Sequence, residues 1–317
     1  MRQRVVNANS QQAVKITGYY HPLYPQSLEA FGDPIALRFC NGYVLKRPIP
    51  GFSDYDAMGC YPLFVCQDWT QLHAGLQDLA AEIVSLSLVT DPFGAYDEQL
   101  LRACFPDVVM PFKEHFVRDM SCSLEASVSE HHRRSARKAL RQIHVERCED
   151  PAACAGDWVR LYQALIARHA IGGIAAFSRD AFEKQLRVPG IVVFQAFFEQ
   201  RILGMLLWYV QGDIAYYHLG AYSTLGYDMR ASFALFWSAI EYFATSGVRW
   251  LNLGAGAGIH HTEQDGLSRF KKGWSTGTRT AYLCGRIFKR DRYTEIVTEK
   301  GVSTTEYFPA YRAGEFQ

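Results

Sequence analysis

A histidine within a strand-like stretch is the first residue whose chemistry stands out. Residues 214–221 (IAYYHLGA) are aromatic and β-prone, and alternation places Tyr216, His218 and Gly220 on one face. The ordinary pKa of histidine lies near neutrality, so His218 could accept a proton from a reacting amine. A buried histidine bonded to a backbone carbonyl is the alternative. Tyr216 and Tyr222 are further candidates for acid, base or substrate contacts.

A basic cluster follows about fifty residues later. Arg269, Lys271 and Lys272 lie in residues 265–273 (DGLSRFKKG), a stretch that predicts a short helix. Their charges could offset negative charge on a substrate, and a solvated basic turn is the alternative reading. Asp265, at the start of the stretch, is another candidate acid or base.

The glycine-rich segment before this cluster suggests two other kinds of site, and both fit poorly. Gly254, Gly256 and Gly258 are spaced as in a dinucleotide fingerprint, but no helix of normal length follows. His260 and His261 suggest a metal, yet neighbouring histidines on a strand point to opposite faces and no second ligand set exists. We therefore expect no metal and no tightly bound cofactor.

The elements around these residues alternate between strands and helices. The predicted order is strand 214–221, turn 222–228, helix 230–246 ending at Gly247, strand 248–253, short helix 265–273 and strand 278–288. Upstream, Asn41-Gly42 predicts a hairpin, residues 50–66 a structured loop, and residues 191–199 with 202–210 another hairpin. This alternation indicates an α/β fold with a mixed sheet.

This succession of motifs resembles the Fem-like branch of the GNAT acyltransferase superfamily, whose members transfer aminoacyl or acyl groups to amines. The family pattern Gly-Leu-x-x-Phe-Lys-x-x-hydrophobic-Gly is matched, up to its last position, by Gly266, Leu267, Phe270, Lys271 and Trp274. The chain departs from the family at Asn252, where an acid is usual, and at Ser275, where glycine is usual. The resemblance covers residues 115–290 well and 1–115 weakly.

For the fold, the resemblance implies two tandem GNAT-like modules, residues 1–124 and 125–317, the first of them degenerate. Tyr55 and Asp56 loosely match a Tyr-Asp-Ala segment of the family, and Asp119 ends a strand as in the family. We expect Asp56 and Asp119 to line a groove between the modules, unless either merely caps a turn. Candidate acceptor contacts are Tyr55, Asp56, Asp119 and Tyr222.

For the chemistry, the resemblance places Lys271 near the donor's terminal phosphate or reacting carbonyl. A helix beginning near Arg230 would aim its N-terminus at phosphates, where free N–H groups favour anions. The approach, residues 223–229, lacks the usual Arg/Gln-x-x-Gly-x-Gly/Ala signature, which argues against coenzyme A and favours aminoacyl-tRNA. The candidate donor contacts are Gly226, Arg230, Ser232, Arg269 and Lys272.

Composition limits the remaining possibilities. The chain has 317 residues, 49% of them hydrophobic, and a net charge of +1, which excludes a strongly basic nucleic-acid-coating protein. A local basic helix at residues 130–142 could still meet a tRNA acceptor end, because Arg134, Arg137, Lys138 and Arg141 share one face. The apolar residues 191–210 are interrupted by charged and polar residues, so they indicate a hairpin and no membrane span.

The N-terminus has no apolar signal core, and the eight cysteines lack CxxC pairs, so we expect reduced thiols and a cytoplasmic protein. Three hypotheses remain: an aminoacyl-tRNA-dependent transferase, an acyl-CoA N-acyltransferase, and a non-catalytic binding module with a decayed site. The acceptor is expected to be a peptidoglycan-precursor amine or a small amine.

Overall fold

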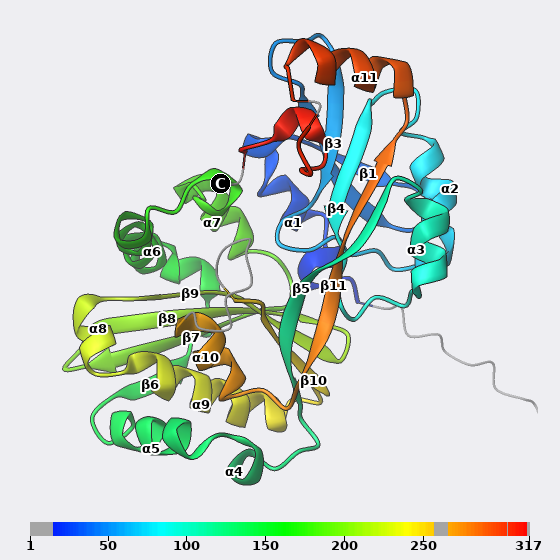
Figure 1. The fold of residues 1–317 in the computed structure, drawn as a ribbon. Coiled ribbons are helices and arrows are strands. Elements are labelled where there is room, and N and C mark those ends of the chain that lie inside the picture. The colour runs from blue at the N-terminus through cyan, green and yellow to red at the C-terminus, as the bar shows by residue number, and fades with distance from the viewer. Residues whose placement is uncertain (1–14, 257–265, 303, 316–317) are drawn as a thin grey trace, which may run out of the picture.

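One mixed β-sheet extends through both halves of the chain (Figure 1). The computed structural model describes residues 15–256, 266–302 and 304–315. Within them the sheet has eleven strands in the order β1-β2-β3-β4-β11-β5-β10-β9-β8-β7-β6. The α/β class is therefore confirmed.

The first half of the chain supplies one end of this sheet and its covering helices. Its main elements are β1 (Asp33–Leu37), β2 (Gly42–Pro48), β3 (Tyr55–Gly59), α2 (Leu72–Gln77), β4 (Ser85–Val89), α3 (Glu98–Cys104) and β5 (Val108–Asp119). The hairpin predicted at Asn41-Gly42 joins β1 to β2, and Asn41 has a φ of 52°. Short helices precede it, including α1 (Leu23–Gln26).

The second half supplies the other end. Its main elements are α5 (Glu130–Ala139), β6 (His144–Arg147), α6 (Ala155–His169), α7 (Arg179–Gln185), β7 (Ile191–Phe198), β8 (Arg201–Gln211), β9 (Ile214–Tyr222), α8 (Thr224–Asp228), α9 (Ala231–Ala244), β10 (Trp250–Gly254), α10 (Gly266–Lys272), β11 (Gly277–Ile287) and α11 (Arg290–Glu299). The β7–β8 hairpin turns at Glu199 and Gln200, both with positive φ, as a two-residue turn requires. None of the described helices has both the length and the apolar composition needed to cross a membrane.

Three local predictions were wrong or incomplete. Residues 55–59 form β3 within the predicted loop, and the strand expected to end at Asp119 is the twelve-residue β5, which begins at Val108. The predicted turn after β9 contains α8, because the Ser223 hydroxyl accepts the Gly226 N–H and caps a helical turn. β5 was hard to recognise because Pro111, Lys113 and Glu114 interrupt its apolar pattern, while backbone pairing to β11 holds it in the sheet.

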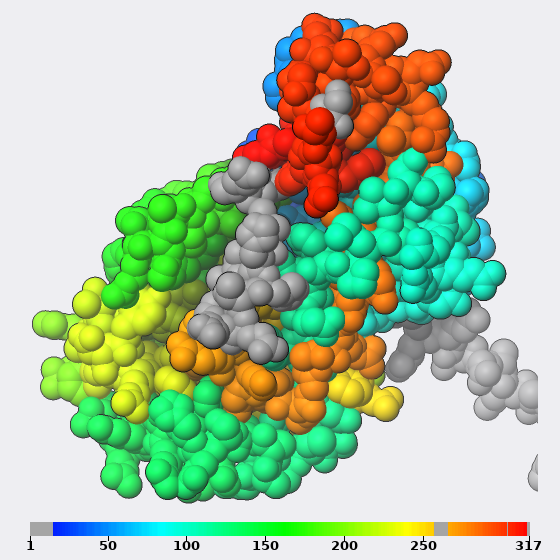
Figure 2. Space-filling model, in the orientation of Figure 1, coloured from blue at the N-terminus to red at the C-terminus, as the bar shows by residue number. Residues whose placement is uncertain are grey.

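Two long strands, β5 and β11, join the halves of the sheet. They pair with each other from Gly277–Val117 to Gly285–Val108, while β11 also pairs with β4 and β5 with β10. Beyond β11, α11 packs against the first half through Ile49, Val84 and Ile296. Figure 2 shows this C-terminal region, orange to red, at one end of the molecule. The division at residue 124 stays a prediction.

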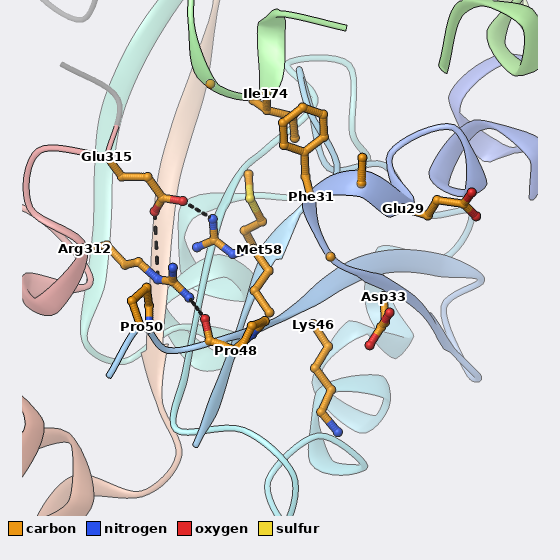
Figure 3. Close-up of a pocket in the computed structure, with 14 residues that line it drawn as sticks. Glu29, Phe31, Asp33, Lys46, Pro48, Pro50, Met58, Ile174, Arg312 and Glu315 are labelled. Carbon is orange, nitrogen blue, oxygen red and sulfur yellow. Dashed lines mark hydrogen bonds and ion pairs between the residues drawn. The ribbon is translucent and has the colours of Figure 1, made fainter. Parts of the chain in front are cut away.

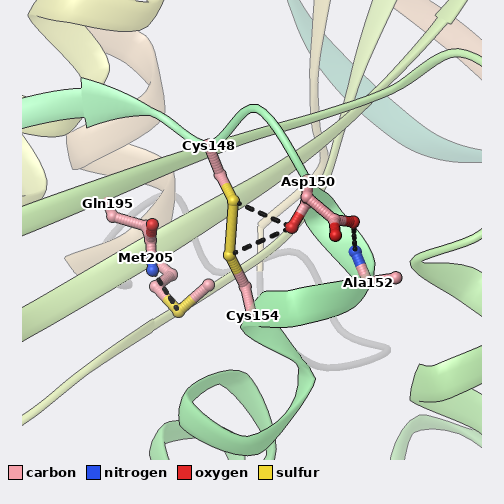
Figure 4. The surroundings of a disulfide bond; sticks show 6 residues. All are labelled: Cys148, Asp150, Ala152, Cys154, Gln195 and Met205. Carbon is pink, nitrogen blue, oxygen red and sulfur yellow. Dashed lines mark hydrogen bonds between the residues drawn. A yellow bond between two sulfur atoms is a disulfide. The ribbon is translucent and has the colours of Figure 1, made fainter.

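The expectation of eight reduced cysteines was wrong for one pair. Cys148 and Cys154 form a disulfide between the end of β6 and the turn that leads into α6 (Figure 4). Asp150 caps the turn over residues 151–154 through its side chain, and this reversal brings the two sulfurs together. The other six cysteines are free.

Candidate active site

The candidate site begins where two neighbouring strands part. The parallel strands β9 and β10 pair from Trp250–Ile214 to Asn252–Tyr216, and the pairing then stops. On the other side of β10, the register with β5 shifts between Asn252 and Gly254. Gly254 has a φ of 75°, a left-handed conformation that favours glycine. We call the unpaired ends, residues 217–222 and 253–256, the β9–β10 fork.

The amino group of Lys271 lies in this fork. Its Nζ donates a 2.6 Å hydrogen bond to the Ala255 carbonyl oxygen and lies 5.5 Å from the centroid of the Tyr217 ring. A Cβ on Gly254 would come within 3.0 Å of the same nitrogen. The lysine is buried, with 6% of its surface exposed. A cation is therefore held between the two strand ends.

Contacts from α5 and β5 fix the helix that carries Lys271. The His132 side chain is hydrogen-bonded through Nε2 to the Phe270 carbonyl oxygen at 2.9 Å and through Nδ1 to the Ser129 hydroxyl at 2.7 Å. Arg118, 1% exposed, donates from Nη1 to the Trp274 carbonyl oxygen at 3.0 Å. Gly273 must be glycine, because a Cβ there would lie 2.1 Å from the His132 ring.

The first turns of α9 lie on the same side of the sheet as Lys271. Phe270 of α10 packs against Phe233 and Phe236 of α9, with ring centroids 5.1 Å and 4.9 Å apart. Trp274, which is fully buried, stacks on Phe236 at 5.8 Å. The helix that begins near residue 230 and the helix that carries the lysine therefore share one aromatic cluster.

A buried carboxyl that sequence reasoning missed lies on the other face of the sheet. Asp91 accepts a 2.7 Å hydrogen bond from the Tyr216 hydroxyl and a 3.1 Å bond from the Phe93 N–H. Burial raises the pKa of Asp91 to about 6, opposed by these bonds and by the charge of Arg279. The Arg279 guanidinium lies over the Phe93 and Trp250 rings, at 4.3 Å and 5.0 Å. The available signal was the pair Asp91-Pro92, which follows the β-prone residues 83–89 (IVSLSLV) after one threonine.

The side chain of His218 points away from Lys271, although its backbone belongs to the fork. The tyrosine next to it, Tyr217, faces Lys271, so alternation turns His218 and Tyr216 to the opposite face. The His218 ring is hydrogen-bonded at Nδ1 to the Tyr19 hydroxyl and at Nε2 to Gln185 Oε1, both at 3.1 Å. Burial lowers the pKa of His218 to about 3. These are the features of a structural histidine.

The candidate donor contacts have mixed surroundings. Gly226 is needed for packing, because a Cβ there would lie 2.0 Å from the Leu203 carbonyl oxygen. Arg230 has a φ of 61° at the start of α9 and donates to the Ser135 hydroxyl at 3.1 Å. Ser232 follows in the first turn of α9, and Arg269 and Lys272 are exposed on α10.

Several predicted residues lie outside the described part of the chain, among them Asp265, Gly258, His260 and His261. Among the residues that the structure describes, no group of three or more histidine, cysteine or acidic side chains is arranged to hold a metal.

Asp119 and Tyr222, two of the candidate acceptor contacts, do not line a groove between the two halves of the described chain. Asp119 is half-buried and accepts from the Ser121 N–H at 2.9 Å and hydroxyl at 2.7 Å, so it caps a turn and its pKa is lowered by these bonds. Tyr222 lies on the Lys271 side of the sheet, with its ring 5.5 Å from that of Tyr227. Burial raises the pKa of its hydroxyl, and the neighbouring Tyr217 raises this pKa further.

Asp56 lies beneath a separate pocket instead of facing it. The pocket, about 490 Å³, is lined by Arg47, Arg312, Glu315 and eleven other residues that include neither Asp56 nor Tyr55 (Figure 3). Asp56 is fully buried and accepts from Arg312 Nε at 2.8 Å and Nη2 at 2.9 Å. Its carboxylate also lies 3.5 Å from Arg47 Nε. It neutralises the arginines from below, while Tyr55 is 41% exposed.

Two of the basic residues on helix α5 form ion pairs with glutamates of the same chain. Arg134 pairs with Glu130, and Arg137 pairs with Glu125 at 2.9 Å, both on the surface. Lys138 and Arg141 are exposed beside them.

Comparisons with known proteins concern the domain and the fold. Residues 126–272 match the family model of the acetyltransferase (GNAT) domain. FemX is similar in structure, with a TM-score of 0.62 and 15% identity over 87% of this chain and 95% of FemX. The search of curated proteins gives no match.

Two further structures share the fold. One is the C-terminal (DUF2156) domain of a protein from Agrobacterium fabrum assigned as a lysylphosphatidylglycerol synthetase, with a TM-score of 0.56 and 15% identity over 88% of this chain and 91% of that one. The other is L-PGS from Bacillus licheniformis, with a TM-score of 0.53 and 14% identity over 86% and 94%.

Residues 126–272 are therefore similar to a GNAT acetyltransferase domain, and the chain shares its fold with FemX and these two structures over most of its length.

The Asp56 ion-pair cluster yields a stability prediction. Asp56→Asn leaves Arg47 and Arg312 without their buried counter-charge, and removing one partner of such a pair costs about 3–5 kcal/mol. Chemical denaturation should show this loss. Asp157→Asn is the control: its partner Arg160 is exposed, and the change should stay within about 0.5 kcal/mol. Equal effects of the two substitutions would contradict the assignment.

Asp91 yields a pH-dependent prediction. A carboxyl with a raised pKa in the folded state stabilises the protein below its unfolded pKa, and this contribution is lost as pH rises through about 6. Asp91→Asn should therefore gain stability relative to the parent protein by about 2.4 kcal/mol between pH 4 and pH 8, because the unfolded carboxyl is already partly ionised at pH 4. Thermal unfolding at both pH values measures it. A difference that does not change with pH would show an ordinary carboxyl.

Proposed function

We propose that this protein transfers an aminoacyl group from aminoacyl-tRNA to an amine. The observation that carries the proposal is the buried Lys271 amino group in the β9–β10 fork, 2.6 Å from the Ala255 carbonyl oxygen. A fork in a sheet offers an extended chain free backbone groups on both sides, and a cation there favours developing negative charge. The reacting carbonyl would lie beside Lys271, which would stabilise the tetrahedral oxyanion.

The two faces of the sheet suggest separate approaches for donor and acceptor. The donor would lie on the α9 side, with phosphate near Arg230 and Ser232 at the helix N-terminus. Exposed Arg269 and Lys272, together with α5, would contact the tRNA backbone. The acceptor amine would approach from the side of Asp91, whose carboxylate, ionised above pH about 6, attracts an ammonium group.

Two observations favour aminoacyl-tRNA over coenzyme A. Residues 223–230 lack the glycines of a pyrophosphate loop, and α8 occupies this position, with Gly226 already used for packing against Leu203. Two structures with this fold carry names of lysylphosphatidylglycerol synthetases. An aminoacyl-tRNA donor is a cytosolic molecule, so the proposal places the reaction in the cytoplasm. The acceptor would be a small amine or a peptidoglycan-precursor amine.

An acyl-CoA N-acyltransferase is the second candidate, favoured by the match of residues 126–272 to an acetyltransferase domain. The two candidates differ in their carrier. Total charged tRNA and a set of acyl-CoAs are each offered with a panel of amines, and products are identified by mass spectrometry. Transfer that RNase abolishes supports the tRNA donor. Transfer that survives RNase, with coenzyme A binding by calorimetry, supports the second candidate, and no product with either carrier indicates a non-catalytic module.

Lys271→Ala tests the catalytic role of the fork. Loss of one oxyanion-stabilising donor typically lowers kcat by about 10²–10³-fold, and we expect a fall of that size with the fold intact by circular dichroism. Lys272→Ala is the matched control, because this neighbouring lysine is exposed. Its kcat should stay within about threefold of the parent value. Its KM for the tRNA should exceed the parent value and depend less on salt, because one phosphate contact is lost. Unchanged kinetics in Lys271→Ala would refute its role.

A further inference from the structure

A second titratable group borders the fork and has no role in the proposal so far. His115 of β5 is 7% exposed, and its Nδ1 lies 3.0 Å from Asn252 Oδ1. The same Asn252 oxygen accepts the Gly254 N–H at 2.9 Å. Gly254 in turn lies against Lys271 Nζ. The four residues form a continuous chain from β5 to the fork.

These contacts fix the protonation of the imidazole. A backbone N–H can only donate, so the Asn252 atom that it meets is the amide oxygen. An amide oxygen can only accept, so the hydrogen between it and His115 must sit on Nδ1. A neutral imidazole protonated at Nδ1 carries its lone pair on Nε2. No residue in the described part of the chain hydrogen-bonds to that Nε2.

The surroundings keep this histidine neutral. Burial lowers the pKa of His115 to about 4, and the charges of Lys271 and Lys113 lower it further, while Asn252 and Glu114 oppose them. Arg279 is its register neighbour on β11. Near pH 7 the ring is therefore a proton acceptor at all times. The attacking nitrogen becomes strongly acidic as it bonds to the carbonyl carbon, so an acceptor of low basicity suffices.

We propose that His115 is the proton shuttle of the transfer reaction and that Asn252 is the residue that positions it. The inference rests on the proposed acyl transfer. The amine lone pair forms the new C–N bond, and His115 Nε2 takes the proton that this nitrogen loses. The C–O bond to the tRNA ribose then breaks with its electron pair on oxygen, and the imidazolium returns the proton to that oxygen. The products are an amide and a free hydroxyl.

This assignment also gives Asn252 a reason to replace the acid that is usual in the family. A carboxylate facing Nδ1 would stabilise the imidazolium and hold the proton on His115. An amide oxygen orients the ring equally well without adding that charge. With asparagine at this position, the pKa of His115 stays low and the imidazolium releases its proton readily.

The first test needs no substrate. Imidazole ¹⁵N shifts of the full-length protein should show His115 protonated at Nδ1 and unchanged from pH 8 to pH 5. In Asn252→Asp the Gly254 bond is retained, and the pKa of His115 should rise by at least one unit. An Nε2-protonated ring in the parent protein, or a pKa that Asn252→Asp does not move, overturns the inference while leaving the transferase proposal standing.

The second test uses charged tRNA with the amine found in the screen. His115→Asn retains a donor toward Asn252 but has no Nε2, and kcat should fall by about 10²–10⁴-fold with little change in KM. Asn252→Asp should move the acidic limb of the kcat profile to higher pH. Parent-like kcat in His115→Asn, with transfer intact, overturns the shuttle alone. A parent protein inert toward every carrier overturns the proposed function and the shuttle with it.

Discussion

The constraint on which the rest of the structure depends is the end of pairing between β9 and β10. Past Asn252 and Tyr216 the strands no longer share hydrogen bonds, so backbone groups near the centre of an eleven-strand sheet need other partners. The Lys271 amino group supplies one for Ala255, and the Asn252 side chain supplies one for Gly254. The side chains that stabilise the interruption are the same ones that could act on a substrate inserted there.

Holding a cation in this position costs desolvation, and the surrounding structure compensates in identifiable ways. The Tyr217 ring and the Ala255 carbonyl oxygen offer Lys271 a π face and an acceptor. The helix that carries it is tied to β5 by Arg118 and to α5 by His132, over an aromatic cluster shared with α9. This explains why so much aromatic surface surrounds a helix of only seven residues.

Local patterns predicted most elements of the second half, because its strands are apolar and its turns carry strong signals. α9 ends at Ala244 with Thr245 as its C-cap, two residues before the predicted end at residue 246, and the β7–β8 hairpin turns at Glu199 and Gln200, one residue before the predicted connection. β5 was only half recognised, since its stability comes from pairing with β11 across about 160 residues of sequence, which no local pattern reveals. The Cys148–Cys154 disulfide was missed for a similar reason: a capped turn, not a motif, brings the sulfurs together.

The candidate site depends even more on contacts between residues that are far apart in the sequence. The motif singled out Lys271, and the structure places its amino group in the fork, whereas His218 was chosen for its type and alternation directs it to the far face. Asp91, in the loop after β4, and His115, on β5, could not be found by spacing, because they meet β9 and β10 only in the folded sheet. A transfer between two substrates needs a donor approach and an acceptor approach that do not overlap. A lysine reached from the α9 side and a carboxylate on the opposite side satisfy that need only where the sheet opens, which ties the function of this chain to the gap between two strands.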